Sequence, residues 1–422
     1  MLHDVKEDYV KSIKNSTSSY DKKHFRYLAS SDFNGWPSPI EEKWRLSRLG
    51  VLSRLKIKPI EPNLRKSSIH NKTIGSNIIK FVDGAFRKDL SSNLPPNIIL
   101  KELNEIESLE FLKKIKKSDL NNHPSTNASL SCTPSIIKLT VDEESNFEEL
   151  IEITYEGGDD DFSVHPVLYI ELKKNSKLSL IEHFNHKSTL VMPLQLIEVQ
   201  EKAYLSSIKI YNDNYDTYNL SAHCALLSKD SKYNSFSLVK GGIFTRSETH
   251  AYLNGSNANL NLNGVYISGK KQHHDLTTAI YHNVPDCTSK QIVRGVLGGF
   301  STGVFQGKVK VSPDAQRTDG QQMSKAILVS QDAKANAKPE LEIYADDVIC
   351  AHGATVGELD DDQLFYLNSR GFGKNKAREI LIKAFLHDII SESVDNKYHD
   401  YIFNEAQTSL SSILNEEKII NE

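Results

Sequence analysis

The chain has 422 residues, and its 51 Lys and Arg residues nearly balance its 55 Asp and Glu residues, for a formal net charge of −4. This length allows two or three domains with a sizeable core, and the balanced charge lacks the basic excess typical of nucleic-acid-binding proteins. The apolar fraction is 38%, and because no apolar run is long enough to cross a bilayer, we expect no membrane span.

The beginning of the chain and its cysteines indicate a cellular compartment. Up to Tyr20 the sequence mixes acidic and basic residues without an apolar segment, which predicts neither a signal peptide nor a transit peptide. Cys132, Cys224, Cys287 and Cys350 are widely spaced and form no CxxC pair. We therefore expect reduced thiols and a cytoplasmic location, without a disulfide framework.

Residues 1–134 are predicted to form an N-terminal helical region that ends in a linker. A helix is expected at 39–48, which opens with proline, and another at 97–117, where apolar residues recur at helical spacing. Residues 121–134 are rich in Asn, Ser, Thr and Pro, which is typical of a linker.

Residues 135–354 change to an alternating pattern that predicts many short β-strands. Leu260 and Leu262 alternate with asparagines, and Leu341 and Ile343 alternate with polar residues. The pattern is compatible with a sandwich, a barrel, a propeller or a β-solenoid. The frequent Asn and Gly residues and the scarcity of hairpin dipeptides favour a solenoid of stacked parallel strands.

The same alternation predicts which side chains lie inside this region. The expected interior residues are Leu260, Leu262, Ile343 and Val348.

Residues 355–422 are predicted to be helical again. Asp360 and Gln363 are spaced as a capping pair at a helix start, and Gly371 is placed to end that helix. Two further helices carry apolar stripes, one with Ala377, Ile380, Leu381, Ala384 and Phe385, the other with Ile402, Phe403, Ala406, Leu410, Ile413 and Leu414. The stripes fit either packing against the chain's own core or docking of a partner.

Motifs for enzyme chemistry are weak. The segment 303–308 is one residue too short for a phosphate-binding P-loop and lacks the Ser or Thr that should follow the lysine. His273, His274 and Asp275, with His282 nearby, could bind a metal or could be ordinary surface or interface residues. On a strand, the two adjacent histidines would point to opposite faces, so at most one would join Asp275.

Cys350 and His352 form a more specific candidate. On an extended strand, residues two apart share a face, and a thiolate beside an imidazole is half of a site for a soft or borderline metal. Two ligands are too few to close such a site, so a partner would have to supply the others. The alternative is a buried cysteine beside a hydrogen-bonded histidine.

Six runs of residues closely resemble the SufB/SufD family of iron–sulfur cluster assembly proteins. They are residues 240–242, 246–250, 318–321, 338–348, 350–357 and 362–371. Residues 42–45 and 81–84 resemble the family more loosely. The Cys-x-His-Gly-Ala-Thr motif that begins at Cys350 is similar to that of the SufD branch.

The resemblance implies a mainly β fold, with a right-handed parallel β-helix core between N-terminal and C-terminal helical segments. It implies a heterodimer with a SufB-like subunit and docking of the SufC ATPase on the C-terminal helices, with a homodimer possible when the chain is alone.

The function that the resemblance implies is that of a non-enzymatic scaffold subunit. A transient iron–sulfur cluster would be shared with SufB at the subunit interface, where this chain would contribute His352, with Cys350 beside it. A flavin is linked to the complex as a whole and is not placed on this chain. The competing hypotheses are an exported-type carbohydrate-active β-helix enzyme and a structural paralogue without a role in cluster assembly.

Overall fold

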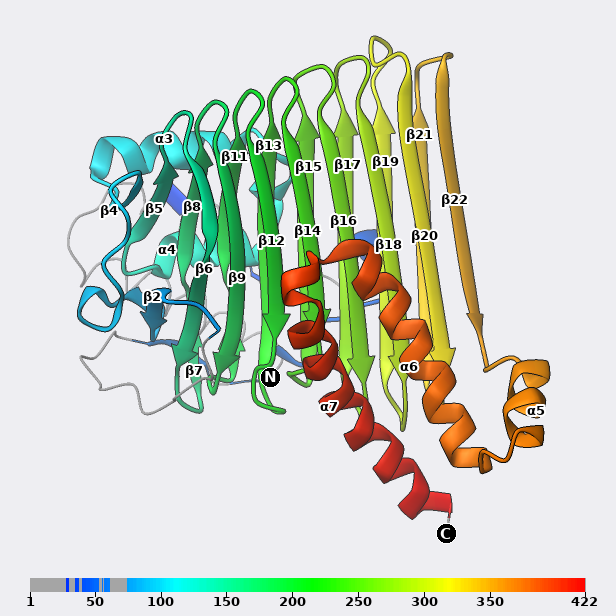
Figure 1. Cartoon of the computed structure of the whole chain (residues 1–422). Helices are drawn as coiled ribbons and strands as arrows, with labels where there is room; N and C mark the ends of the chain where they lie inside the picture. The colour runs from blue at the N-terminus through cyan, green and yellow to red at the C-terminus, as the bar shows by residue number, and fades with distance from the viewer. Residues whose placement is uncertain are drawn as a thin grey trace.

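The core of the molecule is a parallel β-solenoid built from two facing sheets, with helices flanking it (Figure 1). This confirms the predicted mainly β fold. The structure is a computed structural model, and it describes residues 28–29, 35–37, 40–52, 55, 57–60 and 74–421.

The chain passes alternately from one sheet to the other, so that each pair of strands forms one coil. Sheet A contains, in spatial order, β21 (Lys334–Ile343), β19 (Thr302–Val311), β17 (His273–His282), β15 (Phe244–Leu253), β13 (Tyr218–Leu227), β11 (Leu194–Val199), β8 (Val167–Leu172), β5 (Ile136–Val141) and β4 (Ile98–Glu102), with β1 (Lys58–Pro59), β7 (Phe162–Val164) and β10 (Leu190–Val191) beside this path. Sheet B contains β22 (Val348–Gly357), β20 (Thr318–Leu328), β18 (Thr288–Leu297), β16 (Asn259–Ser268), β14 (Lys232–Val239), β12 (Tyr204–Tyr211), β9 (Lys177–His186), β6 (Asn146–Gly157), β2 (Asn77–Val82) and β3 (Ala85–Phe86).

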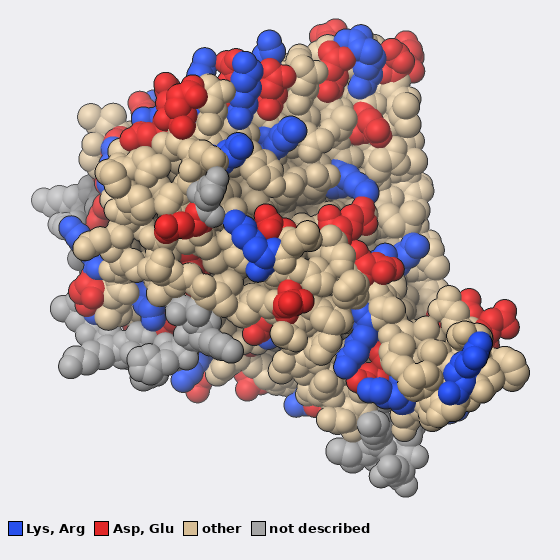
Figure 2. Space-filling view, viewed as in Figure 1, with Lys and Arg blue, Asp and Glu red and all other residues tan. Residues whose placement is uncertain are grey.

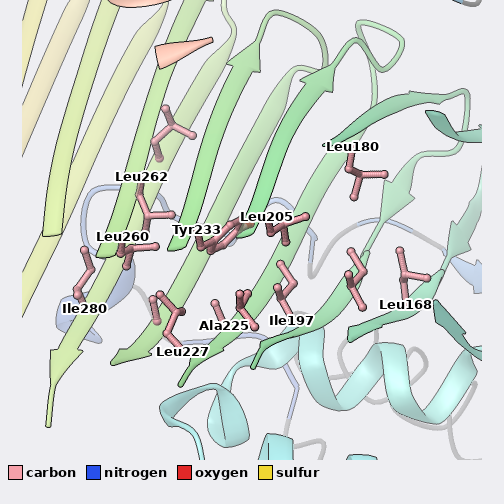
Figure 3. Close-up of a cluster of buried hydrophobic side chains, with 14 of the residues drawn as sticks. Leu168, Leu180, Ile197, Leu205, Ala225, Leu227, Tyr233, Leu260, Leu262 and Ile280 are labelled. Atoms are coloured by element: carbon pink, nitrogen blue, oxygen red, sulfur yellow. The ribbon is translucent and has the colours of Figure 1, made fainter. Parts of the chain in front are cut away.

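Apolar side chains from both sheets fill the space between them (Figure 3). Leu260 and Leu262 lie in this core, as predicted, and Val348 packs partly against it. The prediction for Ile343 is wrong, because 39% of its surface is exposed. Ile343 lies on β21, the last strand of sheet A, where no further coil covers the inward-facing side chains.

One corner of the solenoid is built from residues in the left-handed backbone region. Each strand of sheet B from β9 to β20 follows such a residue: Asn175, Lys202, Asp230, Asn257, Asp286 and Arg317. Asn and Asp tolerate this conformation better than most residues. Their side chains also connect successive coils, since the Asn257 amide donates to the Asp230 carboxylate at 3.0 Å. Two asparagines, Asn175 and Asn257, therefore serve as corner residues, whereas the asparagines that alternate with Leu260 and Leu262 lie on strand β16.

The N-terminal region is less helical than predicted. The expected helix at 97–117 begins as strand β4 and continues as α3 (Glu105–Lys116), which starts at a capping box on Asn104. Within the described residues 40–48 of the expected helix at 39–48, the structure has only the short 3-10 helix η1 (Glu42–Trp44). A second 3-10 helix, η3, spans Lys88–Leu90. Predictions for residues 1–27 lie outside the described residues.

Residues 121–134 are not the predicted linker. They contain the end of the 3-10 helix η4 (Asp119–Asn122) and helix α4 (Pro124–Cys132), which is almost entirely buried. Small polar side chains allow this burial because they bond to nearby carbonyl groups: the Ser129 hydroxyl donates to the Met192 carbonyl at 2.6 Å. A composition typical of a linker therefore belongs to a packed helix.

Three helices follow the last strand: α5 (Asp361–Ser369), α6 (Lys374–Ser393) and α7 (Asn396–Asn421). The Asp360 side chain accepts a hydrogen bond from the backbone N–H of Gln363, and Gly371 has a positive φ of 90°. Both predicted helix ends are therefore confirmed. Within the described residues, no helix is long and apolar enough to span a membrane.

Helices α6 and α7 pack across the outer face of sheet B (Figure 1). The stripe predicted for α7 is confirmed, with Ile402, Ala406 and Leu410 fully buried. The stripe predicted for α6 is displaced: Ala384 is exposed, and the buried residues are Ala377, Ile382, Leu386, Ile389 and Ile390. The sheet, and not the helix pattern alone, determines which side of α6 faces inward.

Candidate functional site

The C-terminal end of the solenoid presents an uncovered coil, formed by β21 and β22 and called here the open end. In the described part of the chain, each of these strands pairs with one neighbour only. Several large apolar side chains are exposed there, including Ile349 (69%) and Tyr344 (60%). An exposed strand edge with apolar side chains is a surface suited to a partner, because it offers unpaired backbone groups and apolar area together.

Cys350 and His352 both lie on β22, within the open end. In the register between β20 and β22, Cys350 is opposite Gly320 and His352 is opposite Gln322. The Gln322 side chain is buried in the preceding coil, and a Cβ atom at Gly320 would point towards the core residue Val309. The two candidate residues therefore share the inward face of the strand, as their spacing predicts. Cys350 packs partly against the core, whereas His352 is exposed.

The Cys350 thiol lies in a partly apolar environment. Its partial burial raises the pKa, and Asp319 raises it further, although a backbone hydrogen bond from Gly320 acts in the opposite direction. The thiol is therefore protonated at neutral pH and becomes a thiolate only when a metal or a positive group stabilises the charge. Cys224, Cys287 and Cys350 all belong to the described residues and are free thiols.

The two candidate ligands do not complete a metal site within this chain. Among the described residues, no group of three or more His, Cys, Asp or Glu side chains is arranged to hold a metal ion. Cys350 and His352 offer one sulfur and one imidazole nitrogen, a donor pair that is chemically compatible with iron but too small to close a metal site by itself.

The His273–His274–Asp275 group and His282 have structural partners. His274 is buried between the Ser268 hydroxyl and the Gly241 carbonyl, and this burial lowers its pKa to about 4. The ring of His273 stacks on Phe244, on the opposite face of the strand. His282 bonds to the Ser289 hydroxyl at 2.8 Å. These contacts account for the three histidines as packed residues, and the burial of His274 and His282 contradicts the expectation that they lie at the surface.

A buried charge network on the outer face of sheet A was missed from the sequence. The Arg246 guanidinium lies 4.1 Å from the centre of the Trp44 ring and bonds to Glu248 and Asp275. Burial alone would raise the pKa of Glu248, but Arg246 and His123 hold it well below its usual range. The network fastens the N-terminal segment to the sheet. Apart from Arg246 and Glu248, which share β15, its members are far apart in the sequence, so no local pattern indicates the whole network.

Helix α5 is the other exposed feature near the open end. Phe365 is 73% exposed, and Tyr366 and Phe372 are 55% and 42% exposed. In contrast to α6 and α7, α5 buries none of its residues. It is therefore an apolar projection that the chain's own core does not cover.

Comparisons with known proteins identify the family. A family model described as "SUF system FeS cluster assembly, SufBD core domain" matches residues 154–385, more than half of the chain. The iron–sulfur cluster assembly protein SufD of Escherichia coli is 34% identical over 235 residues, which are 55% of this chain and 56% of that protein.

Two more relatives extend the match. A SufBD family protein of Mycobacterium leprae is 29% identical over 63% of this chain and 69% of its own length. The chloroplastic protein ABCI7 of Arabidopsis thaliana is 26% identical over 86% of this chain and 81% of its own length. The matched family domain includes most of the solenoid, the open end and the start of the C-terminal helices. The chain therefore belongs to the SufBD core family of the SUF iron–sulfur cluster assembly system.

Proposed function

We propose that the chain is a SufD-type scaffold subunit that pairs with a SufB-like subunit in the cytoplasm and helps to form nascent iron–sulfur clusters. The observation that carries this proposal is the open end, which combines an unpaired strand edge, exposed apolar side chains and two iron-compatible ligands on β22. A partner seated there would cover the apolar surface and bring its own donors to His352 and Cys350.

His352 is the principal ligand in this proposal, because its exposed imidazole is accessible to a partner. Cys350 supports it as a second donor once iron lowers the pKa of the thiol. The cluster is cargo that passes through the complex. The chain itself is not an enzyme in this proposal, and the flavin linked to the complex is assigned to no residue here. A second copy of the chain is expected to use the same edge when the SufB-like subunit is absent.

The test compares His352→Ala and Cys350→Ser in cells that lack other cluster assembly pathways. We expect His352→Ala to lower the rate of cluster maturation by about tenfold, as loss of metal-site groups commonly does, with the complex intact. Thr355→Ala is the matched control, because Thr355 is exposed on the same strand. Normal maturation in an intact His352→Ala complex would refute the ligand role, and loss of the complex would assign His352 to assembly.

We further propose that the SufC ATPase docks on the C-terminal helices, chiefly on α5. The exposed Phe365 and Tyr366 support this choice, whereas α6 and α7 are largely engaged with sheet B. Phe365→Ser combined with Tyr366→Ser should abolish copurification of SufC and keep the β-solenoid folded. Ile106→Ser, at a 72% exposed apolar residue on α3, is the control. Retention of SufC by the double variant would place the docking surface elsewhere.

A further inference from the structure

A groove crosses the outer face of sheet B at the starts of β9, β12, β14 and β16. It holds about 920 Å³ of empty space, part of it open to solvent. Its lining residues all come from these strands and from the corner turns that precede them: Lys177, Lys202, Ala203, Tyr204, Asp230, Lys232, Asn234, Asn259 and Asn261. Neither the open end nor the C-terminal helices contribute to it.

The groove carries a net positive charge, because its lining residues include three lysines and one carboxylate, Asp230. Lys177, Lys202 and Lys232 are exposed, and within the described residues none of them has a carboxylate at ion-pair distance. Lys174, which precedes the same strand β9, is in contrast paired with Glu201 at 3.0 Å. Figure 2 shows Lys and Arg side chains interspersed with Asp and Glu side chains along the edge of the molecule above α6 and α7. The excess of lysines among the lining residues of the groove, in a chain of net charge −4, favours an acidic ligand.

The floor of the groove is a fixed row of amide groups. The Asn261 amide donates to the Asn234 side-chain oxygen at 2.8 Å, and the Asn234 amide donates to the Tyr204 hydroxyl at 3.0 Å. In the described part of the chain, the side-chain oxygen of Asn261 accepts no hydrogen bond. An amide row offers the donors and acceptors that an extended peptide backbone requires.

The dimensions also fit an extended peptide. Lys177, Tyr204, Lys232 and Asn259 occupy one row across the sheet, and neighbouring strands are about 4.8 Å apart, so Lys177 and Lys232 are about 10 Å apart. In an extended peptide, side chains on one face are about 7 Å apart, and flexible lysines span that difference. We propose that this groove binds an extended acidic segment of a partner protein, with its carboxylates on Lys177 and Lys232 and its backbone along Asn234 and Asn261.

The test measures fluorescence anisotropy of a dye-labelled octapeptide of alternating Glu and Ser, titrated with the full chain at low ionic strength. Lys177→Gln combined with Lys232→Gln should weaken binding about tenfold, because two ion pairs are lost in a partly enclosed groove. Lys174→Gln combined with Lys270→Gln removes the same charge from lysines that are already paired, so its effect should stay within about twofold. Asn261→Ala should weaken binding about threefold, since it removes one hydrogen bond.

Several results would overturn the proposal. The first is absence of binding to the wild-type chain. The second is equal weakening of binding by the two double variants. The third is an unchanged affinity in Asn261→Ala, which would indicate that the peptide is attracted only diffusely to positive charge. An octapeptide of alternating Gln and Ser should not bind. Tighter binding of single-stranded octathymidylate than of the acidic peptide would also refute the proposal and indicate nucleic acid. Melting curves of all variants verify that the solenoid is folded.

Discussion

Gly320 and Cys350 are register partners on β20 and β22, and a Cβ atom at Gly320 would lie 3.3 Å from the Cys350 sulfur. The absence of a side chain at Gly320 thus makes room for the thiol. The position of Cys350 depends on this glycine as well as on its own strand.

Replacing Gly320 with valine should force the thiol away from its position. The extra methyl groups would also crowd Val309, and we expect the free energy of unfolding to fall by about 1–3 kcal/mol, as in other overpacked sites. Urea denaturation measures this change. Gly357→Val is the matched control, because Gly357 lies on the same strand as Cys350 and nothing lies within 4 Å of its Cβ position. Equal stabilities of the two variants would contradict the packing role of Gly320.

Substitutions at Leu260 test whether this side chain lies in the interior of the solenoid. It is fully buried between the sheets, so Leu260→Ala should lower the free energy of unfolding by about 2–5 kcal/mol, and Leu260→Asp should prevent folding because it buries an unpaired charge. Lys232→Asp, on the exposed face of the adjacent strand, should change stability by less than about 0.5 kcal/mol. Circular dichroism during thermal unfolding distinguishes these outcomes, and a folded Leu260→Asp protein would disprove the assignment.

His274 should make the protein sensitive to mild acid. The pKa of His274 is about 4 in the folded chain, against about 6.5 in the unfolded chain. Between these values the unfolded chain binds the proton more strongly, so stability falls as the pH decreases from about 6.5 towards 4. In His274→Gln, the loss of stability between pH 7 and about pH 4.5 should be smaller by about 2 kcal/mol.

Ser268→Ala provides the control for this pH dependence. It removes the hydrogen bond between Ser268 and His274 but keeps the titrating ring, so stability should fall at every pH with little change in slope. Denaturant titrations at several pH values give the slopes. The same slope in His274→Gln and the wild type would mean that His274 does not contribute to acid sensitivity.

The purified chain should neither bind ATP tightly nor hydrolyse it. Residues 303–308 occur on strand β19, within the solenoid, and do not form the strand–loop–helix arrangement that cradles phosphates. Phosphate release measured through successive purification steps should fall to the background level. A turnover rate that stays constant through purification would contradict this expectation. The positive control is the same phosphate-release assay on a preparation in which this chain is coexpressed with a Walker-motif ATPase.

The alternating pattern predicted the strands and the shared face of Cys350 and His352, because strand periodicity is local. It only favoured a solenoid over other β folds, and the family resemblance was needed to imply the parallel β-helix. The pattern failed for Ile343, because a local pattern does not show where the stack of coils ends and where inward-facing side chains become exposed. It also failed for residues 121–134, whose small polar side chains are typical of loops but bond inside a buried helix. The network around Arg246 joins three distant segments, so local sequence could not indicate it.

The two ends of the solenoid differ in a way that limits the size of an assembly. At the N-terminal end, β3 and β4 run antiparallel to their neighbours, and α3 follows β4, so the parallel stack cannot be extended there. Two solenoids joined through their open ends would present outward only the ends at which β3 and β4 interrupt the parallel stack. Such a contact stops at a pair, whereas a rod with two open ends would add units without limit and form fibres.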